Sequence, residues 1–586
     1  MTDSKKGADA AAPANGKLSV SVAVTGSGGA GVMTAGNMLL EAAAKAGWYG
    51  LMVRSSGPQI RGGEAAALCR ISSKPVECLD DRFDVLVAVD WENIHRFADE
   101  IPLDSASLIV GDPDQGEPPE VYVKSAARYE RLGMKALAKS IPGSWPNMIA
   151  FGIAAGVIGI PKEVTQAVVE SALKKKRDAL AASLAAVDAG YEAGAGMGGT
   201  AKLAPPAPRS GSRWLISGNQ AAGYGAVRGG IRFVAAYPIT PATEVLEWLA
   251  PSLAEVGGVL VQAEDELASI NMIIGASFGG VPSLTATAGP GLSLMTEALG
   301  LAVTAEVPIV VVDVMRGGPS TGIPAKSEQS DVSIAVNGLH GDAPRIVVAP
   351  NSVADCLTTT QWAVHLAEAL QSPAIVLSDQ FFGQTRAVVD RPDDVAFVGK
   401  RLTAAANTEG YKRYALTESG VSPMAIPGTQ GIAYTADGLE HTERGIPSSG
   451  AKDHAAQLAK RERKLLGYEY GGYWADIEGD GDMAVVTFGS STGPAREAIA
   501  RASADGVRVR LVSMRLLAPA QPEKLAAALK GVTKVLVVEQ NYGGQLLKYL
   551  RSEFQMPGEI KSFRRPGPLP IRAQEVHSQL VQWSRS

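Results

Sequence analysis

The chain has 586 residues, of which 46% are hydrophobic and 20% charged, and its formal net charge is −5. A chain of this length is too long for one hydrophobic core, so we expect about three domains. The mild net charge, without long blocks of one sign, excludes the composition typical of a nucleic-acid-binding protein. The three cysteines, Cys69, Cys78 and Cys356, are too few for a disulfide framework or for the four thiolates of an iron–sulfur cluster.

The first segment, 1–17, is rich in alanine and lacks the apolar stretch of a signal peptide, so we predict a disordered leader. No window of about twenty apolar residues lacks charge, and we therefore expect no membrane span. Together with the few cysteines, these features predict a cytoplasmic protein.

Segment 18–193 is predicted to be a first α/β domain. An alternating strand leads into the glycine-rich turn GSGGAG (26–31), and a helix of small residues follows. Further strands are predicted at 84–89 and 107–112, and a helical run extends over 161–193.

The GSGGAG turn fits the dinucleotide-binding pattern, whose acidic ribose-binding residue stands about twenty positions further on. That region of this chain, WYGLMVRSSG, contains no acidic residue, so we do not expect NAD. A phosphate site and a purely structural turn remain alternatives. The following stretch, 194–212, is rich in glycine, proline and serine and is predicted to be a linker.

Segment 213–390 is predicted to be a second α/β domain, with a doubly wound parallel sheet. Its apolar runs are separated by helix-length gaps, which favours helices on both faces of the sheet. The runs are RFVAAYP (232–238), GVLVQAE (258–264), SLTATA (283–288), PIVVVDVM (308–315), RIVVAP (345–350) and PAIVLSD (373–379).

Two further segments complete the chain. The polar stretch 391–474 has little periodicity apart from a charged helical piece, KDHAAQLAKRERKL, and we interpret it as a connector arm. Segment 475–586 is predicted to be a third α/β domain, because apolar runs at 483–489, 507–514 and 534–541 again alternate with helical segments.

The phrase YPITPATE (237–244) follows the first strand of the second domain. Pro241 is suited to the first turn of a helix, and Thr240 or Thr243 to its N-cap. The free amides at the start of such a helix can bind an anion. Simple capping of the helix is the alternative interpretation.

Three consecutive acids, Glu264, Asp265 and Glu266, open the next predicted helix, where acids often merely complement the helix dipole. Further on, TATAGPG places a glycine turn beginning at Gly289 after a strand. Arg316 ends the strand PIVVVDVM. A buried arginine needs an anionic partner, which is either an internal carboxylate or the carboxylate of a substrate.

Two other patterns argue against metal binding by this chain. The GDG at 479–481 precedes a strand, whereas the magnesium motif of thiamine enzymes follows a strand and has an Asn about 25–30 residues later. Here the next Asn is Asn541. The six histidines form no HxxxH or HExxH pattern, so we expect no catalytic metal.

The phrases at 237–244, 286–297 and 315–331 closely resemble the thiamine-dependent 2-oxoacid:ferredoxin oxidoreductases. GSGGAG with SSGPQIRGGEAAA (55–67) resembles the gamma domain of that family, and EQN (539–541) its terminal domain. Two departures are Gln220, where the family implies Glu, and Ala30, where it implies Gln. The resemblance implies a gamma–alpha fused subunit with a pyrimidine-type thiamine-diphosphate-binding domain and a transketolase C-terminal-like domain.

The resemblance also implies roles for individual residues. Glu266 would bind N1′ of the aminopyrimidine, with Glu264 as the second candidate. Thr240 and Arg316 would bind the oxoacid carboxylate. Cofactor contacts are further implied for Tyr237, Pro238 and Gly289.

As a family member, the chain would work only with a beta subunit, which would supply magnesium, the diphosphate site and a [4Fe-4S] cluster, in an (alpha–beta)₂ assembly. The implied reaction is oxidative decarboxylation of 2-oxoglutarate with coenzyme A to succinyl-CoA and CO₂. Ferredoxin would accept the electrons, and reduced ferredoxin would drive the reverse, carbon-fixing carboxylation. Alternatives are pyruvate or a branched-chain 2-oxoacid as substrate, a self-contained transketolase-like enzyme, or a nucleotide-binding regulatory or scaffold protein.

Overall fold

The computed structural model describes residues 16–57, 63–92, 94–198, 201–208 and 211–586. The chain divides into two compact units, Met1–Leu215 and Ile216–Ser586. Most of the predicted leader (1–17) lies outside the described residues. No helix in the described ranges is both long enough and apolar enough to cross a membrane.

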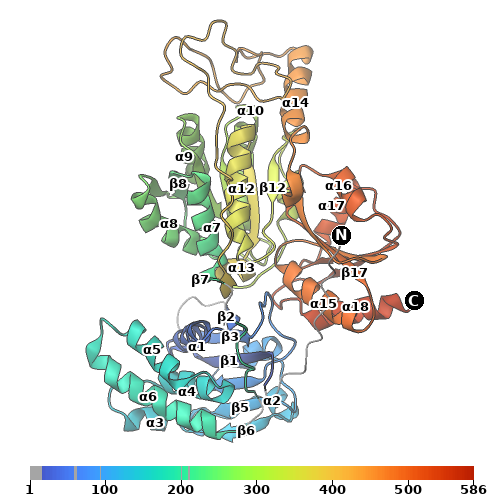
Figure 1. The fold of residues 1–586 in the computed structure, drawn as a ribbon. Helices are drawn as coiled ribbons and strands as arrows, with labels where there is room; N and C mark the ends of the chain where they lie inside the picture. The colour runs from blue at the N-terminus through green and yellow to red at the C-terminus, as the bar shows by residue number, and fades with distance from the viewer. Residues whose placement is uncertain (1–15, 58–62, 93, 199–200, 209–210) are drawn as a thin grey trace, which may run out of the picture. The chain divides into compact units, whose positions relative to one another are not determined.

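The first unit is built on a mixed sheet with the strand order β6-β5-β4-β1-β3-β2 (Figure 1). Its strands are β1 (Ser19–Ser27), β2 (Tyr49–Ser56), β3 (Glu64–Ser72), β4 (Val85–Ala88), β5 (Leu108–Gly111) and β6 (Arg128–Arg131). The predicted strand–turn–helix around GSGGAG is present, because α1 (Val32–Ala46) begins directly after the turn. β1 pairs in parallel with β4 and antiparallel with β3.

Helices cover this sheet, and two of them cross closely. They are α2 (Glu120–Lys124), α3 (Met134–Ser140), α4 (Pro146–Ile158), α5 (Lys162–Ala172) and α6 (Arg177–Gly196), besides α1. A Cβ atom at Gly152 of α4 would lie 2.2 Å from the Val187 carbonyl oxygen of α6, so only glycine permits this approach.

The second unit contains two sheets. The seven-stranded sheet has the order β18-β12-β13-β11-β10-β8-β9, and the five-stranded sheet the order β15-β17-β16-β19-β20. The strands of the larger sheet are β8 (Phe233–Ala236), β9 (Val259–Gln262), β10 (Ser283–Thr287), β11 (Val310–Met315), β12 (Ile346–Val348), β13 (Ala374–Asp379) and β18 (Leu516–Ala518). Those of the smaller sheet are β15 (Ala475–Glu478), β16 (Met483–Thr487), β17 (Val509–Met514), β19 (Lys534–Glu539) and β20 (Glu559–Arg564).

These strands follow from their sequences. Every residue of β11 and β13 is buried, as expected of central parallel strands covered on both faces. The strands alternate with α7 (Gly218–Gly229), α8 (Thr243–Glu255), α9 (Glu266–Phe278), α10 (Gly289–Thr304), α11 (Val332–Asn337), α12 (Asp355–Leu370) and α13 (Gln380–Gln384), and in the last part with α15 (Thr492–Ala504), α16 (Pro522–Ala528), α17 (Gln545–Glu553) and α18 (Ala573–Ser584). The predicted fold class, α/β with a doubly wound parallel sheet, is confirmed.

Strand pairing and a shared apolar cluster, besides the chain itself, join the two sheets of the second unit. β18, which lies between β17 and β19 of the smaller sheet along the chain, pairs antiparallel with β12 of the larger one. One cluster of buried apolar residues includes Val311 of β11 and Val486 of β16. The two sheets therefore share a hydrophobic core within this unit.

The connector arm contains one helix of the predicted charged type, α14 (Ala451–Leu466). Residues 391–450, apart from isolated bridges, form neither helix nor strand, and they loop out beyond one end of the sheet beside α14 (Figure 1). Side chains of the folded core satisfy its backbone: Gln371 donates to the Leu402 and Ser422 carbonyl oxygens at 3.2 and 2.9 Å. These contacts tie the arm to the core and satisfy backbone carbonyls that no helix or strand pairs.

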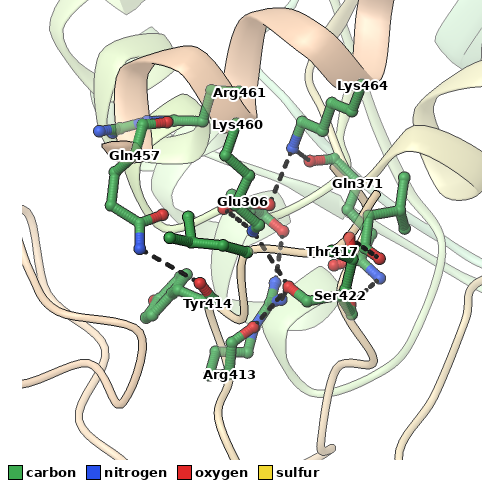
Figure 2. Close-up of polar contacts among 12 residues, drawn as sticks. Glu306, Gln371, Arg413, Tyr414, Thr417, Ser422, Gln457, Lys460, Arg461 and Lys464 are labelled. Carbon is green, nitrogen blue, oxygen red and sulfur yellow. Dashed lines mark hydrogen bonds and ion pairs between the residues drawn. The ribbon is translucent and has the colours of Figure 1, made fainter. Parts of the chain in front are cut away.

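A buried ionic cluster fixes the arm to the body of the unit (Figure 2). Glu306, just beyond the end of α10, is fully buried and accepts from Lys460 at 2.5 Å and Lys464 at 3.0 Å. Arg413 donates to the Glu306 carbonyl oxygen at 2.8 Å. Burial alone would raise the pKa of Glu306, but Lys464, Lys460 and Arg413 together hold it well below its usual value. Burial lowers the pKa of Lys460 to about 8, so this lysine remains charged at neutral pH.

Candidate functional site

The predicted site residues lie along one edge of the seven-stranded sheet. β8 lies between β9 and β10, so the connection from β8 to β9 and the connection from β9 to β10 run in opposite directions along the sheet. Such a reversal opens a crevice at the carboxyl ends of the strands, where α/β proteins bind ligands. Thr240 follows β8, Gly289 follows β10 and Arg316 follows β11. Parallel pairing brings all three to this edge.

Arg316 is the buried cation of this edge. Its side chain is 6% exposed, and Nη1 donates to the Thr240 carbonyl oxygen at 2.5 Å. Within the described part of the chain, its Nε is buried and has no hydrogen-bond partner. Burial lowers the pKa of Arg316, and the charge of Asp331 partly opposes that shift. A guanidinium held in this way can accept an anion that the chain itself does not supply.

The YPITPATE turn differs from its predicted capping. α8 begins at Thr243 with Ala242 as N-cap and without a side-chain cap, so the predictions of a Thr240 or Thr243 cap and of Pro241 in the first helical turn are wrong. Side chains of other elements hold the turn instead: Arg316 donates to the Thr240 carbonyl, and Asn219 donates to the Pro241 carbonyl at 2.8 Å. Thr240 itself is exposed.

The other residues of this turn also lie at the strand end. Tyr237 is 41% exposed and Pro238 is partly buried. Gln384 donates to Glu244 at 2.8 Å and so braces the first turn of α8. Upstream, Gln220 completes a capping box with Ser217, accepting from its backbone N–H at 3.0 Å. Glutamine therefore provides the capping oxygen in place of the glutamate that the family resemblance implies.

The acidic cluster separates into residues with different surroundings. Glu264 and Asp265 are exposed, and Asp265 caps α9 by accepting from the Ala268 N–H at 2.6 Å. Glu266 is 8% exposed. A Cβ atom at Gly291 would lie 2.0 Å from Thr287 Oγ1 and 2.9 Å from Glu266 Oε1, so Thr287 and the Glu266 carboxylate pack directly against this glycine. The structure thus places one buried carboxylate next to the glycine turn of α10.

The glycine turn also contacts a carboxyl group that we did not predict. A Cβ atom at Gly289 would lie 2.7 Å from Asp331 Oδ2, so glycine is required here by close approach rather than by backbone angle. Asp313 of β11 is fully buried, and its burial together with the charge of Asp331 raises the pKa of Asp313 well above its usual value. Asp331 lay within the quoted phrase 315–331, but nothing in the sequence signals its influence on an aspartate inside a strand.

Gln329 was also missed and connects the two sheets of the unit. It is fully buried, its Nε2 donates to the Phe488 carbonyl at 2.9 Å, and its Oε1 accepts from the Gln540 N–H at 2.8 Å. Asn541 donates to the Gln329 carbonyl at 3.1 Å. The end of the segment 315–331 and the phrase EQN (539–541) therefore meet in space and position the loop after Arg316.

The GDG loop (479–481) connects β15 to β16 and so precedes a strand, as the sequence predicts. Asp480 is exposed and pairs with Arg508 at 3.4 Å on the surface. The three cysteines are all buried. Among the described residues, no group of three or more His, Cys, Asp or Glu side chains is arranged to hold a metal ion.

The first unit has a cavity of about 390 Å³ at its glycine-rich turn. Ser27, Gly29 and Ala30 line it, together with Lys135 and Lys139 of α3. The Ser27 N–H and hydroxyl both donate to Asp90, at 2.9 and 2.8 Å to Oδ2. Asp90 thus takes the donors of Ser27, while Lys135 and Lys139 are cationic side chains of the lining that can attract an anion.

With this geometry described, three segments of the chain match known family models. Residues 21–193 match "Pyruvate ferredoxin/flavodoxin oxidoreductase" and residues 224–460 "Pyruvate flavodoxin/ferredoxin oxidoreductase, thiamine diP-bdg". Residues 481–574 match "Pyruvate:ferredoxin oxidoreductase core domain II". The segment that carries the candidate site is thus of the thiamine-diphosphate-binding class.

Relatives match over nearly the whole chain. A 2-oxoglutarate oxidoreductase subunit KorA of Mycobacterium tuberculosis is 32% identical, over 97% of this chain and 92% of the relative. A 2-oxoacid:ferredoxin oxidoreductase subunit alpha of Saccharolobus solfataricus is 28% identical, over 91% and 93%. The solved 2-oxoglutarate:ferredoxin oxidoreductase of Magnetococcus marinus is 36% identical with a TM-score of 0.89, over 97% and 99%. The chain belongs to the 2-oxoacid:ferredoxin oxidoreductase family, which confirms the resemblance.

Proposed function

We propose that this chain is the gamma–alpha subunit of a 2-oxoglutarate:ferredoxin oxidoreductase. The reaction is oxidative decarboxylation of 2-oxoglutarate with coenzyme A to succinyl-CoA and CO₂, with two electrons passing to ferredoxin; reduced ferredoxin drives the reverse. One observation supports 2-oxoglutarate as the substrate. Over nearly the full length of both chains, this chain is similar to the Magnetococcus marinus enzyme solved with 2-oxoglutarate, coenzyme A and succinyl-CoA bound.

Thiamine diphosphate, when bound, supplies the carbon nucleophile that attacks the oxoacid carbonyl. The residues at the sheet edge fit its aminopyrimidine half, because Glu266 is a buried carboxylate that packs against Gly291 in the glycine turn of α10. Glu266 would accept a hydrogen bond from N1′, and Tyr237, Pro238 and Gly289 would contact the same half. A buried carboxylate makes a strong hydrogen bond there because little water competes.

The oxoacid carboxylate would bind to Arg316 and Thr240. The Arg316 side chain is fixed by the Thr240 carbonyl, its Nε has no hydrogen-bond partner among the described residues, and Thr240 is exposed beside it. A pre-oriented guanidinium loses little entropy when it binds a carboxylate. The effect is to hold the reacting carbonyl in one orientation.

Coenzyme A would bind in the first unit, at the cavity beside the glycine-rich turn. Its phosphate groups are anionic, and the two exposed lysines of α3, Lys135 and Lys139, line this cavity. The cavity volume of about 390 Å³ suits part of the coenzyme rather than all of it.

A beta subunit would complete the enzyme in an (alpha–beta)₂ assembly. The chain has three cysteines in total, and its GDG loop is not followed by a helix. We therefore assign magnesium, the diphosphate site and the [4Fe-4S] cluster to that partner. Ferredoxin would accept the electrons that pass through this cluster.

The test is reconstitution of the chain with its beta subunit. The reconstituted complex should reduce ferredoxin with 2-oxoglutarate and coenzyme A faster than with pyruvate or a branched-chain oxoacid, and the isolated chain should be inactive. Faster turnover of pyruvate would overturn the substrate assignment. Turnover by the isolated chain would overturn the shared site.

A further inference from the structure

Arg345 is a buried cation for which the described residues provide no anion. It directly precedes β12 and is 7% exposed. Its Nε donates to the Ala335 carbonyl oxygen at 2.6 Å, and its Nη1 to the Ala343 carbonyl oxygen at 2.8 Å. Within the described ranges, its Nη2 has no hydrogen-bond partner. Burial lowers the pKa of Arg345 to about 10, and no carboxylate of the described chain opposes that shift.

Another buried arginine of the same unit shows how such a charge is usually balanced. Arg515 is 6% exposed, and its guanidinium lies 3.0 Å from Asp355 and 2.8 Å from Asp476. Burial alone would lower the pKa of Arg515, but these two carboxylates raise it above its usual value. A buried charge without such a partner is strongly unfavourable, so an anion from outside the chain would stabilise Arg345.

Arg345 borders a groove between α11, α14 and α17. Two cavities, of about 540 and 390 Å³, adjoin there, and the residues that line both are Val336, Asn337, Ala343, Pro344, Arg345 and Glu462. Leu458 and Leu465 of α14 and Tyr549 of α17 add further apolar walls, each to one of the two cavities. The groove therefore combines a mostly apolar lining with one guanidinium.

The charges around the groove limit what it can bind. Arg345 is the one cation among the described residues that line it. The other charged lining residues, Asp342, Glu462 and Glu553, are exposed. Salt screens exposed charges, so these acids repel one buried anion only weakly. They add to the cost of a second negative charge, which favours a ligand with a single carboxylate.

The groove is distinct from the candidate site at the carboxyl ends of the strands. Arg316 follows β11, whereas Arg345 precedes β12. Both strands pair in parallel with β13, which lies between them. The two arginines therefore lie at opposite ends of the parallel strands, and a ligand at Arg345 would occupy a second site.

We propose that this groove is a binding site for an organic acid with one carboxylate and an apolar chain. The carboxylate binds the Arg345 guanidinium, and the chain packs against Val336, Leu458 and Leu465. The cavity volumes suit a small organic molecule. Because the acid contacts α11 and α14 at once, its binding stabilises the folded chain. The inference goes beyond the proposed function and uses none of the residues assigned to the reaction.

The test is a titration of the full chain with hexanoate as the probe. Hexanoate should raise the thermal midpoint and bind at one site in isothermal titration calorimetry. Two molecules of matched length serve as comparisons: 1-hexanol lacks the charge, and adipate would bring a second carboxylate into the apolar part of the groove. Both should bind at least about tenfold more weakly than hexanoate, because hydrogen bonds to charged groups are the stronger ones.

Substitutions separate the guanidinium from the shape of the groove. Arg345→Met should weaken hexanoate binding at least about tenfold, and its thermal midpoint without ligand shows whether it is folded. Asn337→Trp leaves Arg345 in place but fills the groove from an exposed position, and should weaken binding to a similar extent. Arg444→Met, at an exposed arginine that does not line the groove, is the control and should bind hexanoate like the native chain.

Three results would overturn the inference. They are equal binding of hexanoate and 1-hexanol, unchanged hexanoate binding in both groove variants, and binding by the isolated chain that disappears in the complex with its beta subunit. The last result would mean that a carboxylate of the partner, rather than a free acid, occupies the groove. None of these measurements involves turnover, so failure of the inference and failure of the proposed function remain distinguishable.

Discussion

Glu266 and Glu264 stand two positions apart in the chain, yet one is buried beside the glycine turn of α10 and the other is exposed. Replacing Glu266 with Gln keeps the size of the side chain but removes the carboxylate that would bind the aminopyrimidine. We expect turnover of the reconstituted enzyme to fall by at least about a hundredfold, with an unchanged thermal midpoint. Glu264→Gln is the matched control and should change turnover less than about twofold. Equal losses would show that Glu266 has no special role.

At this scale the sequence predicts residue types better than contacts. Arg316 could be selected because a cation at the end of an apolar strand needs an anion, and the structure does bring it to Thr240. The atom that makes this contact is the Thr240 carbonyl, which no side-chain pattern reveals. Gln329 was missed for a related reason: its partner Gln540 is 211 residues away along the chain, and local spacing gives no sign of such a pair.

Elements were predicted well where burial alone determines them. The run PIVVVDVM became β11 (Val310–Met315), because a continuous apolar run favours a strand covered on both faces. The start of α8 was predicted wrongly, because Asn219 and Arg316 from other elements hold the preceding turn. Local capping rules fail when tertiary contacts satisfy the same backbone groups.

The attachment of the connector arm, including its helix α14, to the body of the unit depends on one carboxylate. Glu306 follows α10, whose other end forms the glycine turn of the site, so the ionic cluster also anchors that helix. Glu306→Gln would leave Lys460, Lys464 and Arg413 buried without their anion. We expect the free energy of unfolding to fall by about 3–5 kcal/mol, measured by denaturant titration, and the arm to become sensitive to protease.

A matched pair on the surface provides the control. Lys412 and Glu443 are 2.9 Å apart, with side chains 41% and 33% exposed, so Glu443→Gln should cost about 1 kcal/mol or less. The pKa of Glu306 is lowered in the folded chain, so its stabilisation is present above the usual glutamate pKa and is lost as pH falls below that value. The native chain and Glu306→Gln should therefore differ at neutral pH and converge in acid. An equal cost for both substitutions would contradict the role of the cluster.

At the scale of the whole molecule, the predicted division at 390/391 and 474/475 stays a prediction. The structure adds that the parts beyond residue 216 share one core, with β18 pairing with β12. Sequence periodicity identifies each strand but cannot indicate which sheet a short strand joins. The first unit, by contrast, has its own cavity.

This separation predicts that the two substrates can be affected independently. Lys135→Glu with Lys139→Glu reverses the charge at the cavity of the first unit without touching the sheet edge that would bind the oxoacid. KM for coenzyme A should rise by about tenfold, which corresponds to the loss of roughly one charged contact, while KM for 2-oxoglutarate stays the same.

Lys175→Glu, an exposed lysine of the same unit that does not line the cavity, should change neither value. Because added salt screens exposed charges, the difference in KM for coenzyme A between native and doubly substituted enzyme should shrink as ionic strength rises. A parallel rise in both KM values would mean that the substitutions disturb the enzyme as a whole, and the assignment of coenzyme A to this cavity would then be wrong.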